Sequence, residues 1–390
     1  MATVLLTGAT GTVGSALAPC LKARGNKVIC LVRPDHNLDP AERMRRIFGG
    51  APVADAIWPG DITLPLAGVS DSERNGWRGR IDKIVHCASS ISFDESRDAA
   101  TATINVVGTG TMLNLAEDLR VPEIHYVNTA YIAGDADYFG ENDFDVGQRP
   151  RNTYERTKFD AERLIRRWRG RKSIYRLAIV VGDSATGFTP KFTGYYRPFA
   201  FFYQLRQFLQ RKLGSAVMRK YQDDGVVFNG GENLILPIRI NCSPVSTLNL
   251  VPRDWVAETM AKLVGIPASG TTFHLVHPGP RRIREITDIS LILLGIKGYS
   301  YGPYNGNGNG HEQGSALKRL QEGFDRSAEA YLPYIIHEAE FGCGNMERVL
   351  GADFVAPPDV DEKFFAVLLD YAKSVGFGKP EQSQLQAVGV

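Results

Sequence analysis

The chain has 390 residues, of which 43% are hydrophobic and 23% charged, and its formal net charge is +2 at pH 7. These proportions are those of an ordinary globular protein, long enough for one large core or for a core with a second lobe. The small net charge gives no general reason to expect a nucleic acid or an anionic membrane as a partner.

Targeting and metal-binding patterns are missing from the sequence. No apolar run approaches the roughly 18 residues that a transmembrane helix needs, and no basic segment precedes the first apolar stretch as in a signal peptide. The five cysteines are scattered and form no Cys-x-x-Cys pair, which favours free thiols over a metal site. We therefore expect a cytoplasmic protein without a membrane span.

The first predicted elements are a buried strand at residues 2–7 and an apolar-periodic helix that ends at Gly25, joined by the turn Gly8-Ala9-Thr10-Gly11-Thr12-Val13-Gly14. A dinucleotide-binding fingerprint requires this context. Its glycines allow a tight turn, close approach to a pyrophosphate and close helix–strand packing, and the helix N-terminus favours phosphate. The predicted cofactor contacts here are Thr7, Gly8, Thr10, Gly11, Thr12, Val13 and Gly14.

The second predicted strand, residues 27–32, is a continuous apolar run that ends at Arg33. At this position an acid would bond the ribose 2′-hydroxyl of NAD, whereas an arginine accommodates the 2′-phosphate of NADP. Arg33 therefore favours NADP(H). The alternative is a solvated arginine at the end of a strand.

Three further strands are predicted, ending near Asp61, at Ala88 and at Thr129, with a helix over residues 105–119. Strands separated by helices of this length indicate a parallel sheet, in which ligands bind beyond the carboxyl ends of the strands. The pair Asp61-Ile62 falls where an adenine edge could be held. The predicted cofactor site is thereby extended by Asp61, Ile62, Ala88 and Ser89.

The chemistry is predicted to lie with Thr129, Tyr154 and Lys158. Tyr154 and Lys158 are four residues apart at the start of a predicted helix, so they share one face. A lysine ammonium lowers the pKa of a neighbouring phenol, which gives a general acid, and the Thr129 hydroxyl could bond the same substrate oxygen. Without the glycine-rich turn and the strand-end hydroxyl, the same spacing would favour a half-buried tyrosine and a surface lysine.

These motifs, together with Asn105-Val106-Val107-Gly108-Thr109, resemble those of the extended short-chain dehydrogenase/reductases. The resemblance implies an α/β fold: a Rossmann-type doubly wound parallel sheet with a smaller, mostly helical C-terminal substrate lobe. It also implies that Tyr154 donates the proton, that Lys158 binds the nicotinamide ribose and lowers the pKa of Tyr154, and that Thr129 orients the carbonyl. Asn105 matches a family asparagine, and a helix-supporting role fits it equally well.

A narrower resemblance lies in residues 85–93, 129–134, 179–187 and 250–257, which are similar to thioester reductases and fatty acyl-CoA reductases. Those enzymes use NADPH to reduce a carrier-protein- or CoA-bound thioester to an aldehyde, and sometimes onward to an alcohol. Leu177 stands where the family usually has a proline. The match fades between Phe188 and Leu236, the part expected to select the substrate.

The predicted domain organisation is an NADP(H)-binding Rossmann domain, a substrate-binding lobe and a disordered tail. Their respective residues are 1–187 with 245–262 returning, 188–244 with 263–375, and 376–390. The alternating Asn and Gly residues at 305–310 predict a loop, either a lid or an exposed connection.

Two compositional features of the middle of the chain are open to more than one interpretation. The aromatic residues of 188–208 either line an apolar substrate mouth or fill a core. The basic residues of 163–172 and 206–220 either dock an acidic carrier protein or the phosphates of CoA, or form solvated helix faces.

The preferred functional prediction is an NADPH-dependent reductase of acyl thioesters, with an acyl carrier protein as a possible partner. The first alternative is a biosynthetic ketone or aldehyde reductase, which would share the same motifs. The second is a sugar-nucleotide or hydroxysteroid-type dehydrogenase, against which Arg33 argues mildly. The third is a nucleotide sensor without catalysis, but such proteins usually lack the tyrosine or lysine. The sequence leaves the oligomeric state open.

Overall fold

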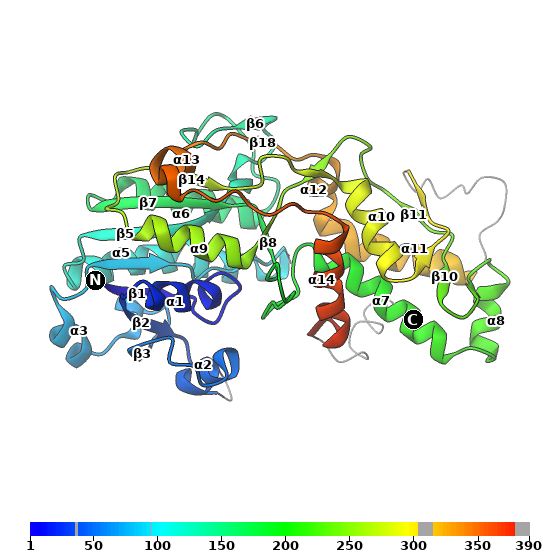
Figure 1. Cartoon of the computed structure of the whole chain (residues 1–390), viewed down its shortest axis with the longest axis horizontal. Helices are drawn as coiled ribbons and strands as arrows, with labels where there is room; N and C mark the ends of the chain where they lie inside the picture. Colours follow the sequence, from blue (N-terminus) through cyan, green and yellow to red (C-terminus); the bar gives the residue numbers. More distant parts are fainter. Residues whose placement is uncertain (36–37, 94, 303–314, 379–390) are drawn as a thin grey trace. The chain divides into compact units, whose positions relative to one another are not determined.

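The computed structural model describes residues 1–35, 38–93, 95–302 and 315–378 (Figure 1). The chain forms two compact units. Unit 1 comprises Met1–Gly182, Leu250–Pro278 and Ala339–Pro358, and unit 2 comprises Asp183–Asn249, Gly279–Glu338 and the described part of Asp359–Val390. The predicted loop at 305–310, and the predicted tail from residue 379 onward, lie outside the described residues.

Unit 1 is built on a seven-stranded sheet with the order β14-β7-β5-β4-β1-β2-β3, in which every neighbouring pair is parallel. Its strands are β1 (Thr3–Thr7), β2 (Lys27–Val32), β3 (Ala56–Pro59), β4 (Lys83–His86), β5 (Glu123–Thr129), β7 (Arg171–Leu177) and β14 (Thr272–Leu275). The predicted doubly wound α/β fold is confirmed.

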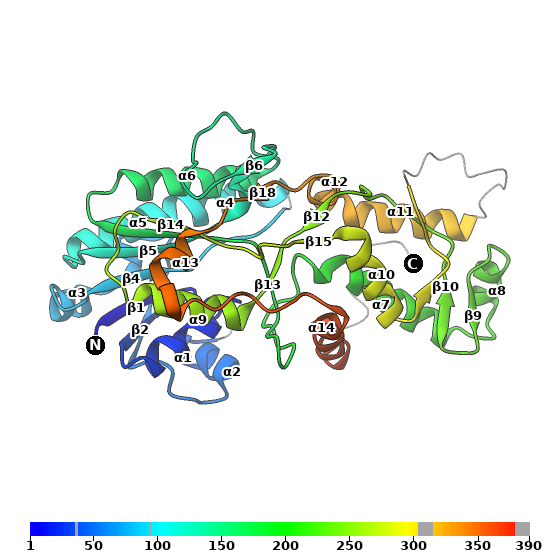
Figure 2. The ribbon, with the colours of Figure 1, turned by 45° about the horizontal axis from the view of Figure 1, so that its top comes forward.

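Helices cover both faces of this sheet (Figure 2). On one face lie α1 (Gly14–Ala23) and α9 (Arg253–Val264), and on the other α5 (Gly108–Asp118) and α6 (Thr153–Arg167). The core between the sheet and the helices α5 and α6 contains apolar side chains from elements that are far apart in sequence, among them Leu5 of β1 and Met112 of α5. Both faces of the sheet are therefore withdrawn from water, as the continuous apolar strands require.

Shorter elements complete unit 1. Three helices follow strands: α2 (Pro40–Phe48), α3 (Asp71–Trp77) and α4 (Asp98–Ala102), which continues into a π-helical turn, Thr103–Val107. Two small parallel pairs join β8 (Ile179–Val181) to β13 (Leu250–Pro252), and β6 (Tyr138–Phe139) to β18 (Glu340–Phe341). The helix α13 (Asn345–Leu350) and a short 3-10 turn, Gly351–Asp353, follow β18.

The chain returns to unit 1 twice, and both returns reach residues that the sequence assigned to the second lobe. The first carries β13, α9 and then β14, which extends the sheet beside β7. The second carries β18 and α13. The predicted roles of the two parts, cofactor binding and substrate binding, remain predictions.

Unit 2 is mostly helical, with small sheets. Its helices are α7 (Tyr196–Arg211), α8 (Ala216–Gln222), α10 (Ile283–Leu293), α11 (Ser315–Ala328), α12 (Leu332–Ile336) and α14 (Glu362–Ser374). Its strands are β9 (Val227–Asn229), β10 (Asn233–Ile235), β11 (Arg239–Ile240), β12 (Thr247–Leu248), β15 (Arg281–Arg282), β16 (Ile296–Lys297) and β17 (Ser300–Tyr301). The described chain runs past residue 375 to Gly378, and Phe377 is buried.

The aromatic residues of 188–208 supply much of the core of unit 2. Phe199 and Phe202 are buried in α7, and the ring of Phe202 lies 5.1 Å from that of Phe324 in α11. The ring of Tyr195 lies 5.6 Å from that of Phe365 in α14. Of the two interpretations of this aromatic segment, these contacts favour the core.

None of the helices within the described ranges combines the length and the apolar character needed to cross a bilayer.

A buried ion pair ties α6 to β7. Arg176 and Glu162 both have fully buried side chains, and two guanidinium nitrogens of Arg176 donate to the Glu162 carboxylate, at 2.7 and 3.1 Å. The carbonyls of Gly140 and Asp143 accept further bonds from the same guanidinium, at 3.3 and 2.6 Å. A buried charge is tolerated only with such full pairing. The pair therefore fixes the helix that carries Tyr154 and Lys158.

We predict that Arg176→Leu lowers the free energy of unfolding by about 3–5 kcal/mol, because it leaves the Glu162 carboxylate buried without its main partner. The matched control is Arg149→Leu. The Arg149 side chain is 88% exposed and pairs with a carboxylate at the surface, so its removal should change stability little. Denaturant unfolding of the three proteins measures both effects, and equal stabilities would contradict the account.

Candidate active site

The glycine-rich turn is packed too tightly for a side chain at Gly8 or at Gly14. Gly8 has φ +75°, and a Cβ atom there would lie 2.8 Å from the backbone nitrogen of Ala88. A Cβ on Gly14 would lie 2.2 Å from the Gly8 carbonyl oxygen. The turn is closed by a hydrogen bond from the Gly11 nitrogen to the same carbonyl, at 2.9 Å. Glycine is therefore required at both positions, because any other residue would clash with the backbone. The turn connects the end of β1 at Thr7 to the start of α1 at Gly14.

Thr7 links the ends of the two central strands. Its hydroxyl bonds Nδ1 of His86 at 2.8 Å and accepts a bond from the Ala88 nitrogen at 3.1 Å. Burial lowers the pKa of His86 to about 3, so the imidazole is neutral. Ser89 follows Ala88 and is exposed. Thr7 thus holds the loop after β4 beside the glycine-rich turn, at the point where the strand order reverses direction and where such folds bind nucleotides.

The predicted adenosine contacts also lie at this edge of the sheet. Arg33 is exposed and directly follows β2. One carboxylate oxygen of Asp61 accepts bonds from the nitrogen and hydroxyl of Thr63, at 2.9 and 2.8 Å. Ile62 is buried, and a Cβ on Gly108 would lie 2.7 Å from its Cδ1 atom. The side chain of Ile62 therefore packs closely on the start of α5.

A second arginine, which no sequence motif indicates, lies beside the glycine-rich turn. Arg43 of α2 donates from Nη2 to the Thr10 hydroxyl at 3.2 Å, and its Nη1 donates to the Arg33 carbonyl. The helix that carries it has a readable start, since the Asp39 side chain accepts from the Glu42 nitrogen and Pro40 follows. The contact across 33 residues has no local signal. Arg43 brings a second guanidinium to the glycine-rich turn.

Tyr154 lies in the first turn of α6, whose N-cap is Asn152. Its ring meets that of Phe93 edge to face, at 5.7 Å and 85°. Burial raises the pKa of Tyr154 to about 12, and a hydrogen bond with Thr129 opposes the shift. The Thr129 hydroxyl also donates to the Leu177 carbonyl at 3.3 Å. The structure thus brings Tyr154 and Thr129 together.

Lys158 is 3% exposed. Its ammonium donates to the Val127 carbonyl at 2.8 Å and lies 4.6 Å from the centre of the Tyr126 ring. Burial lowers the pKa of Lys158 to about 7, while the Glu162 carboxylate opposes the shift. The sequence led us to expect Lys158 to lower the pKa of Tyr154. Burial instead has the larger effect on the phenol, which keeps its proton at neutral pH.

Asn105 holds the loop after β4 to α6. Its amide nitrogen donates to the Ser90 carbonyl and to the Thr157 hydroxyl, both at 3.0 Å, and its amide oxygen accepts from the Ser90 nitrogen at 2.8 Å. It lies within the π-helical turn Thr103–Val107. These contacts occupy the amide fully enough to favour the helix-supporting interpretation.

All the predicted site residues lie in unit 1, and two sets of them meet, Thr7, Gly8 and Ala88 in one and Tyr154 and Thr129 in the other. The loop after β4 connects them, since Ala88 meets the glycine-rich turn at one end and Phe93 meets Tyr154 at the other. Part of the predicted basic cluster on α6 serves the fold instead, because Arg166 pairs with Glu162 at 2.8 Å and Arg163 with Asp160 at 3.1 Å.

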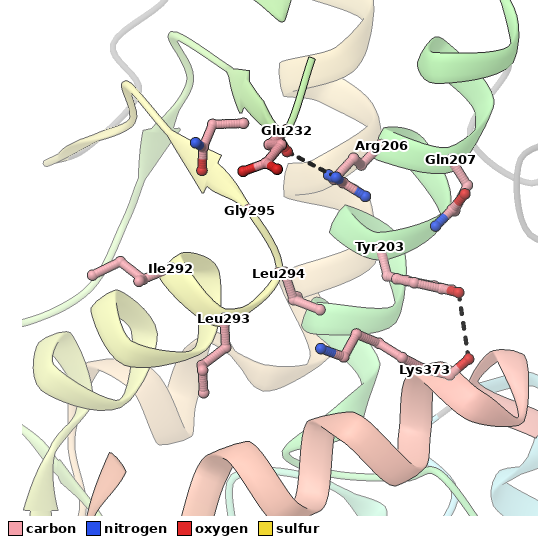
Figure 3. Close-up of a pocket in the computed structure, with 10 residues that line it drawn as sticks. Tyr203, Arg206, Gln207, Glu232, Ile292, Leu293, Leu294, Gly295 and Lys373 are labelled. Carbon is pink, nitrogen blue, oxygen red and sulfur yellow. Dashed lines mark hydrogen bonds between the residues drawn. The ribbon is translucent and has the colours of Figure 1, made fainter. Parts of the chain in front are cut away.

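Unit 2 contains a separate cavity of about 520 Å³, which includes none of the predicted site residues (Figure 3). Tyr203 and Arg206 of α7, Leu294 and Lys373 are among its lining residues. Arg206 donates to the Glu232 carbonyl at 2.8 Å. Nothing in its chemistry selects a ligand class.

A comparison with protein families is decisive for the chain's membership. The NAD-binding family described as male sterility protein matches residues 6–260. The chain belongs to this family. Membership confirms the predicted extended short-chain dehydrogenase/reductase of the thioester reductase group, and with it the NAD(P)-dependent oxidoreductase class.

Relatives and solved structures extend this result. A linear gramicidin synthase of Brevibacillus parabrevis is 23% identical over 95% of this chain. The terminal R domain of the myxalamid PKS-NRPS pathway has a TM-score of 0.69 at 24% identity, covering 97% of this chain and 92% of that one. A thiolation-reductase di-domain from an archaeal non-ribosomal peptide synthetase has a TM-score of 0.65 at 18% identity, covering 97% and 76%. At these identities the likeness of the structures shows the fold.

The chain is much shorter than its curated relatives. It spans 7% of the length of the linear gramicidin synthase, and a match to the hybrid PKS-NRPS synthetase thnA of Trichoderma harzianum covers 3% of that protein.

The residues present fit a nicotinamide dinucleotide. Glycine at positions 8 and 14 lets the turn pack closely on Ala88 and on itself, as the dinucleotide-binding turn requires, and the N-cap of α1 gives no side-chain bond to the first-turn N–H groups. Arg33 and Arg43 lie toward the second strand, where the adenosine ribose is bound in such folds.

We predict that Gly14→Ala lowers the affinity for NADP(H) at least tenfold, about 1.4 kcal/mol, because the new Cβ would force the turn away from Gly8. Gly76→Ala in α3 is the control, since a Cβ there meets no atom within 4 Å. It should keep the affinity unchanged. Calorimetric titration measures both, and a folded Gly14→Ala protein with full affinity would contradict the steric argument.

Proposed function

We propose that this protein is an NADPH-dependent reductase that converts a carrier-bound acyl thioester into an aldehyde and a free thiol. The observation that carries the proposal is the meeting of Tyr154 and Thr129 at the sheet edge that also holds the glycine-rich turn. Family membership supports the chemistry. The names of the relatives, which are synthetases and reductase domains, support the thioester as substrate.

In the proposed site each group has one task. The backbone from Gly8 to Gly14 binds the pyrophosphate through N–H groups and the helix dipole. Arg33 and Arg43 bind the 2′-phosphate, and guanidinium–phosphate pairs suit that role. Lys158 binds the nicotinamide ribose, as the family resemblance implies. When bound, NADPH supplies the hydride.

Tyr154 and Thr129 act on the substrate oxygen. Both hydroxyls donate to the thioester carbonyl, for which the Thr129 proton turns away from the Leu177 carbonyl, and these bonds polarise the carbonyl carbon. As the hydride adds to that carbon, Tyr154 gives its proton to the oxygen, so no isolated oxyanion has to form. The raised pKa of Tyr154 suits this step because the phenol is protonated at neutral pH.

The product of this step is a hemithioacetal. Its carbon–sulfur bond then breaks, the hydroxyl proton leaves, and the sulfur takes up a proton. The products are an aldehyde and a thiol, so one hydride and one proton are consumed in total. A ketone or aldehyde substrate would need only the first step.

We predict that NADPH binds more tightly than NADH, and that Arg33→Ala and Arg43→Ala each weaken NADPH binding by roughly 10- to 100-fold, about 1.5–3 kcal/mol for a lost bond to a charged group. NADH affinity should stay unchanged. Arg46→Ala in α2 is the control, because Arg46 pairs with Glu42 at 2.9 Å and is 62% exposed. Equal affinities of the unmodified protein for NADPH and NADH would contradict the proposal that the two arginines bind the 2′-phosphate.

We predict that NADPH is oxidised in the presence of an acyl-pantetheine or acyl-CoA thioester, with release of thiol. Tyr154→Phe should reduce turnover by about 10²–10⁴-fold while NADPH affinity is kept. Tyr138→Phe, at a tyrosine that is 55% exposed, should behave like the unmodified protein. Oxidation with the matching aldehyde or ketone but with no thioester would instead identify a simple carbonyl reductase.

A further inference from the structure

An arginine that is distant in sequence, Arg253, packs against the glycine-rich turn. Arg253 is the first residue of α9 and is 5% exposed. Its Nε donates to the Thr12 carbonyl at 3.1 Å, and its Nη2 donates to the Ser15 hydroxyl at 2.5 Å. The first contact spans 241 residues. Two nitrogens of one planar guanidinium thus bind both the glycine-rich turn, at Thr12, and the first helical turn of α1, at Ser15.

The fold places Arg253 there for a clear reason. Strand β13 pairs in parallel with β8, with Pro252 opposite Val181, and the Arg253 nitrogen lies 3.4 Å from the Gly182 carbonyl. Helix α9 therefore starts at the end of this pair and runs beside α1 on the same face of the sheet (Figure 2). Arg24, the C-cap residue of α1, and Glu258 of α9 form an exposed pair at 3.3 Å.

The bond to the Thr12 carbonyl fixes the direction of the neighbouring backbone N–H group, that of Val13. In a trans peptide the carbonyl of one residue and the N–H of the next point in opposite directions. While the Thr12 carbonyl faces Arg253, the N–H of Val13 therefore faces away from it. Rotation of this peptide would break the bond at 3.1 Å. The bond to Ser15 anchors the helical side of the same turn.

The guanidinium also adds charge where an anion is expected. Residue Val13 at the N-cap of α1 provides no side-chain cap, and the first turn of the helix carries no acidic residue. The positive end of the helix dipole is thus reinforced by a buried cation. Electrostatic effects at buried positions are stronger than at the surface.

We propose that Arg253 is a positioning residue for the pyrophosphate of the cofactor, which it serves by holding the Thr12–Val13 peptide in the donor orientation and by adding positive charge beside the turn. The proposal rests on the proposed use of NADP(H). It separates pyrophosphate binding from binding of the adenosine 2′-phosphate, because Arg33 and Arg43 would bind the 2′-phosphate without help from Arg253.

The test compares two ligands by calorimetric or NMR titration. NADP⁺ contains the pyrophosphate, whereas 2′-AMP contains the adenosine and 2′-phosphate only. Arg253→Gln should weaken the binding of NADP⁺ at least tenfold. The affinity for 2′-AMP should stay within about twofold of that of the unmodified protein, because this ligand lacks the pyrophosphate. Arg253→Lys keeps the charge without the planar fork, so its NADP⁺ affinity should fall between those of the unmodified protein and Arg253→Gln.

Arg24→Gln is the matched control, because it removes a different contact between α1 and α9 and should leave both affinities unchanged. A general loss of structure would weaken both ligands equally and would overturn the proposal, as would an unchanged NADP⁺ affinity in Arg253→Gln. If Arg253→Gln does not fold, Ser15→Ala and Arg253→Lys make the same comparison. Failure of the unmodified protein to bind either ligand would instead contradict the proposed function.

Discussion

The candidate site depends on the close approach of the glycine-rich turn to the backbone at the end of β4. A Cβ on Gly8 would lie 2.8 Å from the Ala88 nitrogen, and one on Gly14 would lie 2.2 Å from the Gly8 carbonyl oxygen. Because neither residue has a side chain, Gly8 packs on the loop after β4, and the start of α1 at Gly14 packs on Gly8. The same loop reaches Tyr154 through Phe93. One steric constraint therefore sets both the cofactor turn and the surroundings of the proton donor.

Burial governs the charges of the reacting groups. It raises the pKa of Tyr154 to about 12 and lowers that of Lys158 to about 7, so both groups are biased toward their neutral forms. Glu162 opposes the effect on Lys158 and is itself held by Arg176. The buried ion pair is thus connected to the chemistry, since it keeps a carboxylate one helical turn from the lysine. The arrangement suits a donor that must hold its proton until the hydride adds.

Short sequence motifs were enough to predict the features that depend on residues close together in the chain. The turn from Gly8 to Gly14 and the spacing of Tyr154 and Lys158 are short motifs, and the strand predicted to end at Thr129 is β5 (Glu123–Thr129). The contacts of Arg43 and Arg253 with Thr10 and Thr12 span 33 and 241 residues. They result from the packing of α2 and α9, which no periodicity encodes. The raised pKa of Tyr154 was missed for a related reason, because burial depends on the assembled core.

The central claim is that Tyr154 protonates a thioester carbonyl while a hydride is delivered to its carbon. The most direct measurement uses NADPH carrying deuterium at the transferable position of C4, with an acyl-pantetheine thioester as substrate and mass spectrometry of the products. The account predicts an aldehyde, or an alcohol derived from it, with deuterium on the former carbonyl carbon. One free thiol should be released for each molecule of labelled product. Thiol release with an unlabelled carboxylic acid as the only product would show hydrolysis in place of reduction and would contradict the account.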